Sequence, residues 1–324
     1  MNKVVVGVST YGMVDQVEGF IRSFWNSSEE VGVEILPVCV DDGTPNRARV
    51  REREAFCRRN HFEFIAHSTN RGISAAWNSI IGYAKDQGAE VAIIFNDDIR
   101  MLGPGWLTRM LYFFDNNQDL GTIGFPLVHE MGFSDTDPRW DVAPGVVGAA
   151  VGCSFAVRVE DAFSIDNPDG SIGLWDDLLS FHEEVHLGFR LAQKGKTSFM
   201  LPWPPVWHKG GQTFAANPEL TFRAPSPFLP IEEFLRYARS SAFYLKEYEP
   251  YYEKGRVDRM MYSRAMFCKY WGILNMDRKM VIDDIERDIW NEPQIYVHQL
   301  VVPKRLDKEI VWINKSGKRE TTIV

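Results

Sequence analysis

The stretch VAIIFNDDIRM, residues 91–101, begins as an apolar run and then places an amide and two carboxylates side by side. Its first five residues, 91–95, are all apolar, which is typical of a strand buried inside a sheet. Asn96, Asp97 and Asp98 follow at the point where such a strand would end. The stretch therefore predicts a buried strand that delivers polar side chains to one edge of a sheet.

Similar strand-like runs alternate with amphipathic segments through the first half of the chain. The runs are KVVVGVST (3–10), VEILPVCVDD (33–42), FEFIAHS (62–68), EVAIIFNDDI (90–99) and LGTIGFPLV (120–128). Between them lie segments such as residues 13–25, in which apolar side chains recur on one helical face. This alternation is the pattern of βαβ units, so we expect an α/β fold with a mostly parallel central sheet and flanking helices.

The composition is that of an ordinary globular protein. The chain has 324 residues, of which 45% are hydrophobic, and its net charge of −8 argues against a non-specific polyanion binder. The four cysteines show no CxxC spacing, so neither a zinc site nor a disulfide framework is indicated. No apolar run approaches the roughly twenty residues of a membrane helix, and the first run reads as a strand rather than a cleavable signal, so we expect a cytoplasmic protein.

Acidic residues follow two strands of the expected sheet. Asp41 and Asp42 close the second run, and Asn96, Asp97 and Asp98 close the fourth. One such pair would more often cap a helix or form a turn, but two in one sheet favour a ligand site, since ligands bind beyond the carboxyl ends of parallel strands. The turn STYGMVDQ after the first run is neither GxGxxG nor GxxxxGK[ST]. Phosphate would then be held through a divalent cation, Mg²⁺ or Mn²⁺, bound by carboxylates.

Several segments resemble, in order, the motifs of the GT-A glycosyltransferases, and in particular glycosyltransferase family two. They are VVVGVSTYG (4–12), VDDGTPN (40–46), NRGISAAWNSIIGYA (70–84), FNDDI (95–99), GCSFAVRVEDAF (152–163) and SFHEEVHLGFRLAQKG (180–195). The resemblance implies a GT-A catalytic domain over residues 1–212, with a nucleotide-binding half, 1–100, and an acceptor and catalytic half, 101–212.

The resemblance also implies roles for the residues at the strand ends. Asp98 would bind the metal, Asp97 would bind the nucleoside ribose, and Asn96 would lie with them at the donor. Asp41 would accept a hydrogen bond from a pyrimidine N–H. The residues lining the base would be Ser9, Thr10 and Tyr11, with Ser9 and Gly12 departing from the usual Pro and Asn of this turn.

The NRG motif would meet the donor phosphates at the start of a helix. Arg71 and backbone amides such as that of Gly72 could contact the phosphate oxygens. For Asn70, a plain N-terminal cap is about as good an interpretation as ligand contact.

Two glutamates compete for the role of catalytic base in SFHEEVHLGF. Ser180 followed by Glu183 matches a capping box, which gives Glu183 a structural role. Glu184 falls where the family has its aspartate base, so we expect Glu184 to take the proton of the acceptor. The sequence departs from the family here, because Glu stands for Asp at this place and His186 stands for a second Asp.

LPWPPVWHKGGQTF, residues 201–214, contains a second candidate metal ligand. A lone histidine is more often structural, but His208 resembles the C-terminal histidine that completes the metal shell in GT-A enzymes. Lys209 could add positive charge beside the leaving diphosphate. An imidazole ligand favours Mn²⁺ over Mg²⁺.

Residues 213–324 differ in charge from the rest. Residues 1–212 hold 18 Lys and Arg against 28 Asp and Glu, whereas 213–324 hold 18 against 16. Segments 230–255 and 258–290 read as helices rich in aromatic residues, and 294–303 and 309–317 read as strands, so we expect a smaller, mainly helical region that ends in strands. Its aromatic and basic residues could form a nucleic-acid surface, but packing against the catalytic domain or in a homo-oligomer is the commoner use.

These features together predict a metal-dependent glycosyltransferase that moves a sugar from a nucleotide diphosphate donor, with a UDP-sugar favoured, and inverts the anomeric configuration. A saccharide, a lipid-linked sugar, a protein and a modified DNA base all stay open as acceptors. One alternative is a nucleotidyltransferase, although STYG lacks the expected phosphate loop. The other is a non-catalytic nucleotide-sugar-binding module, against which the presence of Glu184 and His208 argues.

Overall fold

The structure is a computed structural model of the chain, and it describes nearly all of the first 125 residues and parts of the remainder. The described residues are 1–12, 14–28, 32–125, 127–129, 145–147, 152–178, 183–201, 206–209, 221–240, 245–271, 309–313 and 319–323. The expected strand at 294–303, the capping residue Ser180 and the Gly210 and Gly211 pair lie outside them.

The central sheet has eight strands, and six of them run in the same direction. In order across the sheet they are β3 (Glu63–Ala66), β2 (Glu34–Asp41), β1 (Lys3–Thr10), β4 (Val91–Asn96), β9 (Ser154–Arg158), β6 (Leu120–Gly124), β10 (Thr197–Met200) and β8 (Gly145–Val147). Only β9 and β8 run against the others. The prediction of a mostly parallel sheet is confirmed.

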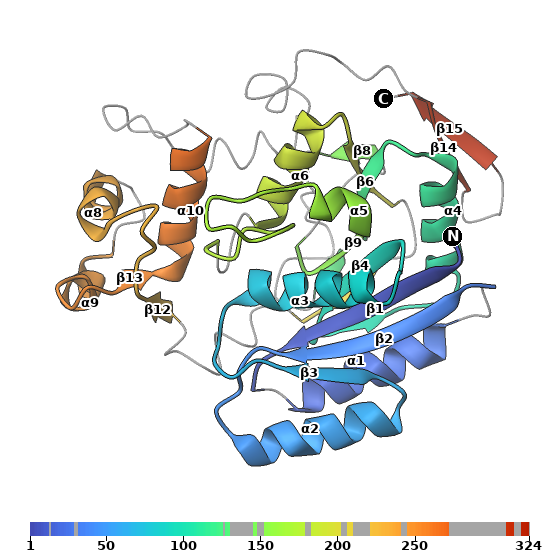
Figure 1. The fold of residues 1–324 in the computed structure, drawn as a ribbon, viewed down its shortest axis with the longest axis horizontal. Helices are drawn as coiled ribbons and strands as arrows, with labels where there is room; N and C mark the ends of the chain where they lie inside the picture. Colours follow the sequence, from blue (N-terminus) through green and yellow to red (C-terminus); the bar gives the residue numbers. More distant parts are fainter. Residues whose placement is uncertain are drawn as a thin grey trace.

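Helices cover both faces of this sheet (Figure 1). One face carries α1 (Val14–Ser27), α2 (Arg47–Arg59) and α4 (Trp106–Asn116), and the other carries α3 (Ile73–Asp86), α5 (Val159–Phe163) and α6 (Glu183–Gln193). Along β1, Val4 and Val6 belong to the first core and Val5 to the second, as the period of two in a strand requires. Gly7 lets α3 approach closely, because a Cβ there would lie 2.3 Å from the Ile80 side chain.

A small second sheet lies directly beyond β4. Its strands are β5 (Ile99–Met101), β11 (Val206–His208) and β7 (Leu127–His129), with β11 in the middle. β11 runs antiparallel to β5, and His208 pairs with Ile99 in that register. Val206–His208 of β11 are thereby placed beside the end of β4.

The C-terminal segment packs on the side of α6 that faces away from the sheet. Its elements are β12 (Phe222–Arg223), α8 (Ile231–Ser240), the 3₁₀ helix η2 (Lys246–Tyr248), α9 (Glu249–Tyr252), β13 (Val257–Asp258) and α10 (Arg259–Tyr270). Leu187 and Leu191 of α6 belong to the core of the sheet, whereas Val185 and Phe189 belong to a third cluster shared with α8 and α10. The α6 helix therefore packs against the sheet on one side and against the C-terminal helices on the other.

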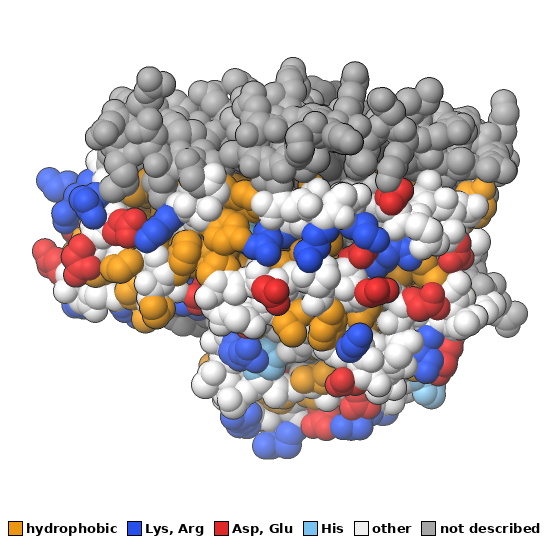
Figure 2. All heavy atoms as spheres, turned by 45° about the horizontal axis from the view of Figure 1, so that its top comes forward, with side chains coloured by type: hydrophobic (Ala, Val, Ile, Leu, Met, Phe, Trp, Pro, Cys, Tyr) orange, Lys and Arg blue, Asp and Glu red, His pale blue; other side chains and the backbone are white. Residues whose placement is uncertain are grey.

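The chain ends in a hairpin of β14 (Glu309–Ile313) and β15 (Arg319–Ile323), and β14 lies against α4 (Figure 1). Helices α8 and α10 lie within the expected helical segments 230–255 and 258–290, and β14 lies within the expected strand 309–317; residues 272–308 are outside the described part of the chain. Basic and acidic side chains are interspersed on the face shown in Figure 2. Within the described segments, no helix combines the length and apolar character needed to cross a membrane.

Candidate active site

The carboxyl ends of β1 and β4 lie side by side and bring predicted donor residues together. Ser9 pairs with Asn96 in the parallel register, and Ser9 Oγ lies 3.4 Å from Asn96 Oδ1. Thr10 Oγ1 donates a 2.5 Å hydrogen bond to Asp97 Oδ2. Tyr11 is the next residue along the chain and is buried. The turn after β1 and the end of β4 therefore form one continuous polar edge.

Asp97 is a buried carboxyl group at this edge. Burial and the charge of Asp98 raise the pKa of Asp97 to about 7, although the Thr10 hydrogen bond and two arginines, Arg53 and Arg100, act in the opposite direction. Arg100 Nη1 also donates to the Asp97 backbone carbonyl at 2.9 Å, which ties the turn in place. A carboxyl group that titrates near neutral pH can donate or accept a hydrogen bond, so Asp97 could meet a ligand hydroxyl in either state.

Asp98 and His208 form a close pair at the same edge. Asp98 Oδ1 lies 3.3 Å from His208 Nε2, because β11 pairs with the strand that starts directly after Asp98. This oxygen is buried, so the pair is shielded from solvent. A carboxylate oxygen and an imidazole nitrogen at this spacing fit one divalent cation, and Mn²⁺ accepts both ligand types. No group of three or more His, Cys, Asp and Glu side chains that could hold a metal is found in the described part of the chain.

His208 and Lys209 are fixed by neighbours of this pair. Burial would lower the pKa of His208, but hydrogen bonds to Asp98 and Cys153 raise the pKa to about 10. By itself His208 is therefore an imidazolium at neutral pH. The backbone N–H of Lys209 donates to the Asp98 carbonyl at 3.1 Å, which holds Lys209 next to the predicted diphosphate position.

Asp41, at the end of β2, is fully buried and has protein partners on both carboxylate oxygens. Oδ1 accepts a 2.8 Å hydrogen bond from the Thr44 backbone N–H, and Oδ2 forms an ion pair with Arg53 of α2. Arg53 is fully buried as well. Each carboxylate oxygen can accept a second hydrogen bond, so contact between Asp41 and a pyrimidine N–H stays a prediction.

Asp42 organises the NRG motif. Its carboxylate accepts hydrogen bonds from the backbone N–H groups of Arg71 and Gly72, at 2.9 and 2.8 Å, and from Asn70 Nδ2 at 2.9 Å. The two amides expected to meet phosphate thus already have an acceptor within the protein. Contact with phosphate would instead fall to the Arg71 side chain, which is exposed and lies 3.0 Å from Asp176.

The two candidate bases on α6 have different surroundings. Glu183 is only 5% exposed, and burial together with the charge of Glu184 raises its pKa well above the usual value. Glu183 Oε2 has no hydrogen-bond partner among the described residues, and the expected partner Ser180 lies outside them. Glu184 is half-buried, and its carboxylate lies over Gly152, where an added Cβ would be 2.8 Å from Glu184 Cδ.

Gly152 and Cys153 link Glu184 to the Asp98 and His208 pair. Gly152 packs against the Glu184 carboxylate, and the next residue, Cys153, hydrogen-bonds His208. The Cys153 carbonyl also accepts a 3.0 Å hydrogen bond from the Asn96 N–H. The candidate base and the candidate metal pair therefore each contact one of two consecutive residues.

His186, which stands for the second acidic residue of the family motif, is fully buried between α6 and α10. Its Nε2 lies 3.0 Å from Asn167 Oδ1, and its ring contacts Trp175 and Tyr270. Burial and the charge of Arg190 lower the pKa of His186 to about 3, so its ring is neutral at physiological pH. His186 thus joins the catalytic helix to the C-terminal segment.

Four residues of this site had no assigned role in the sequence: Asp42, Arg53, Gly152 and Cys153. A signal exists for three of them, since Asp42 stands in VDDG and the dipeptide opens GCSFAVRVEDAF. Arg53 carries no such signal, because it is one of several arginines in α2 and only packing selects it to meet Asp41.

Comparison with known proteins finds a family that resembles the first half of the chain. Residues 6–160 match the family model Glycosyl transferase family 2. A comparison with curated protein sequences finds no match. Among solved structures, the chain is similar to the mannosyltransferase PcManGT from Pyrobaculum calidifontis in complex with GDP-Man and Mn²⁺, with a TM-score of 0.51 and 12% identity over 92% of this chain and 83% of that chain.

Two structures of TarS from S. aureus are also similar. TarS 1-349 gives a TM-score of 0.50 and 13% identity over 93% of this chain and 83% of that chain. A second TarS structure gives a TM-score of 0.49 and 14% identity over 64% of this chain, and only 37% of that chain is covered.

The fold and the family match point to the same class of protein. The chain has the GT-A fold of the glycosyltransferases, as the resemblance of its motifs implied and the PcManGT likeness confirms. Residues 6–160, just under half of the chain, resemble a glycosyl transferase family 2 domain.

Proposed function

We propose that the protein is a metal-dependent glycosyltransferase that transfers a sugar from a nucleotide diphosphate donor, with a UDP-sugar favoured, and inverts the anomeric configuration. The observation that supports this proposal is the dipeptide of Gly152 and Cys153, in which Gly152 packs against the Glu184 carboxylate and Cys153 hydrogen-bonds His208. An acceptor bound between the two would meet a base on one side and a leaving diphosphate on the other. The complex of PcManGT with GDP-Man and Mn²⁺ supports a donor and a cation of this kind.

Asp98 and His208 would hold the cation, which when bound supplies positive charge to the donor diphosphate. Thr10 and Asp97 would bind the nucleoside at the shared edge of β1 and β4. Lys209 would add charge near the leaving group from its place beside Asp98. The preference for uridine rests on Asp41, whose carboxylate would accept from the N–H of the base.

Glu184 would act as the general base. The acceptor oxygen forms a bond to the anomeric carbon while the bond from that carbon to the diphosphate oxygen breaks, and the acceptor proton moves to Glu184 Oε. A single displacement of this kind inverts the anomeric centre. Glu183 is unsuited to the role, because its buried carboxyl group has a raised pKa and so favours the neutral form.

The test is a screen for donor hydrolysis across nucleotide sugars with Mn²⁺, since water can stand in for the acceptor. Wild type should release the nucleoside diphosphate from at least one UDP-sugar, and Glu184→Gln should retain donor binding but lose turnover. Glu183→Gln should keep most of the activity if it has only a structural role. Donor binding by wild type with no turnover in the presence of candidate acceptors would contradict the proposal and indicate a binding module.

A further inference from the structure

Arg259 connects the C-terminal segment to the loop beside the carboxyl ends of β1 and β2, where the nucleotide is predicted to bind. It is the first residue of α10, and its Nη2 donates to Asn70 Oδ1 at 3.2 Å. Asn70 is held in turn by Asp42 at the end of β2. In Figure 1, β12, β13 and the start of α10 lie near the loop that leads into α3. The positively charged side chain of Arg259, which lies outside residues 6–160, is thereby placed beside the predicted donor site.

Two more arginines accompany Arg259. Arg223 lies on β12 and pairs with Val257 in the antiparallel register, and Arg256 directly precedes β13. Burial lowers the pKa of Arg259 to about 10, and the positive charges of Arg223 and Arg256 act in the same direction. The charges of Asp42 and Tyr11 raise the pKa of Arg259, so Arg259 lies close enough to the ends of β1 and β2 to interact with these two residues.

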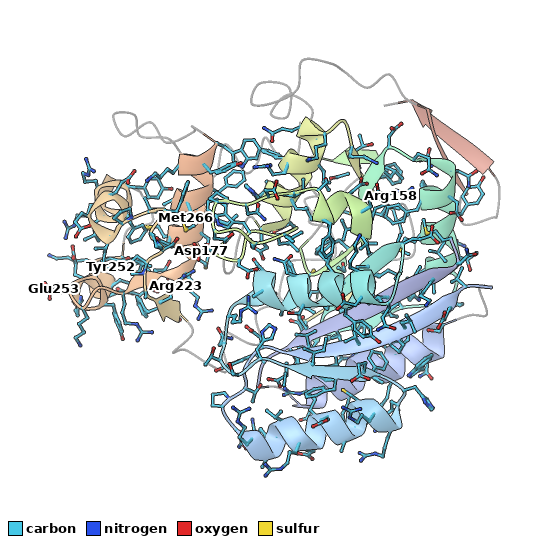
Figure 3. The ribbon with its side chains drawn as sticks, viewed as in Figure 1. Arg158, Asp177, Arg223, Tyr252, Glu253 and Met266 are labelled. Atoms are coloured by element: carbon cyan, nitrogen blue, oxygen red, sulfur yellow. The ribbon has the colours of Figure 1, made fainter. Side chains whose placement is uncertain are left out.

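Of the guanidinium groups of Arg223, Arg256 and Arg259, only that of Arg223 has a carboxylate among its hydrogen-bond partners in the described part of the chain. Arg223 donates to the Asp177 carbonyl at 3.1 Å and lies 3.5 Å from the Asp177 carboxylate, and Figure 3 labels both residues. Arg256 donates to the Phe222 carbonyl at 2.6 Å, and Arg259 donates to the Asn70 amide oxygen, so both have neutral acceptors.

Arg259 has unused hydrogen-bonding capacity on its buried side. Its Nε is buried and has no acceptor among the described residues. A buried donor without an acceptor is costly, and the cost grows when like charges surround it. An oxyanion would supply both the acceptor and the negative charge, and a guanidinium group binds phosphate oxygens through two parallel hydrogen bonds.

We propose that Arg223, Arg256 and Arg259 form a phosphate-binding subsite beside the carboxyl ends of β1 and β2. This inference rests on the proposed function, because the phosphate would belong either to the nucleotide donor or to an acceptor that itself carries a phosphate. In both cases the C-terminal segment takes part in substrate binding in addition to packing on α6. Arg259 is the central member, since it reaches the loop of Asn70.

The test compares Arg259→Gln with wild type and with Arg236→Gln, a matched variant at an exposed arginine of α8. Calorimetry would measure the affinity for inorganic phosphate in the presence of a chelator, and for UDP and uridine with Mn²⁺. Arg259→Gln should weaken phosphate binding by at least about tenfold, as expected for the loss of hydrogen bonds to a charged group, whereas Arg236→Gln should not. Arg256→Gln, at an exposed position, is a second variant and should weaken phosphate binding in the same direction, with circular dichroism checking that it is folded.

The two sources of phosphate give different results. If the donor supplies it, Arg259→Gln weakens UDP but not uridine. If the acceptor supplies it, UDP affinity is unchanged, and wild type saturated with UDP still binds phosphate. The subsite would be overturned if Arg259→Gln and Arg256→Gln bound phosphate as tightly as wild type does and also bound UDP as tightly as wild type does. Failure of every nucleotide sugar to react would count against the proposed function alone, because the phosphate titration does not depend on turnover.

Discussion

Replacing Gly152 by alanine should disturb the candidate base without altering its chemistry. The added Cβ would lie 2.8 Å from Glu184 Cδ and 3.0 and 3.1 Å from the two carboxylate oxygens. Ordinary van der Waals contact begins at 3.4 Å, so the carboxylate has to move by the difference, about 0.6 Å. The backbone tolerates the change, because Gly152 is not among the glycines with a positive φ angle.

The expected effect on turnover follows from this displacement. A misplacement of about 1 Å can cost roughly 10²-fold in rate, so a shift of this size should lower kcat by roughly tenfold. That factor corresponds to about 1.4 kcal/mol of transition-state stabilisation. Donor affinity should be unchanged, because the substitution leaves the residues at the ends of β1 and β4 in place.

The assay is release of nucleoside diphosphate from the donor identified in the hydrolysis screen. Gly82→Ala in α3 is the matched control, because a Cβ at that position meets nothing within 4 Å, and it should keep full activity. Glu184→Gln should lower turnover by roughly 10²–10⁴-fold. Adding Gly152→Ala to Glu184→Gln should then change nothing further, since Gly152 acts through that carboxylate. A further tenfold loss in the double variant would refute this reasoning.

Three other substitutions test separate parts of the molecule. Asp98→Asn should abolish Mn²⁺-dependent UDP binding in calorimetry while the fold is retained, because an amide supplies less charge to a cation; unchanged affinity would remove Asp98 as a ligand. Arg53→Leu should lower the free energy of unfolding by about 3–5 kcal/mol, since Asp41 is left as an uncompensated buried charge, and denaturant titration measures this; a loss below about 1 kcal/mol would show that the pair is unimportant for stability. His186 should make the protein less stable as pH falls from 6.5 towards about 3, because the unfolded chain binds a proton in that window and the folded chain does not. His186→Gln should therefore reduce the slope of unfolding free energy against pH by up to about 1.4 kcal/mol per pH unit, and an unchanged slope would contradict the buried neutral ring.

Much of the fold follows from local features of the sequence. The apolar runs at 3–10 and 91–95 become β1 and β4, and the amphipathic segments between the runs become α1, α2 and α3. Helix and strand differ in the period of their apolar residues, and this period is visible in a single segment. The polar residues at the strand ends were visible for the same reason, and their place at one edge follows from parallel pairing.

The expected role of the NRG motif shows where local reasoning falls short. Its position at the start of α3 was predicted, but the partner of its amides was not. Asp42 is nearly thirty residues away in sequence and reaches Arg71 and Gly72 only because β2 ends beside that loop. A sequence motif gives the donors available for hydrogen bonds, whereas the acceptor depends on which strand ends nearby.

The amino-acid sequence by itself therefore determined the α/β class, the order of the βαβ units and the acidic edge at Asp97 and Asp98. Only the tertiary structure decided which distant residues meet at that edge. His208 reaches Asp98 through the pairing of β11 with β5, Gly152 meets Glu184 through the packing of α6, and Arg259 reaches Asn70 through the packing of the C-terminal segment. Contacts of this kind leave no periodic trace in the chain, because they depend on strand register and helix packing summed over the whole domain.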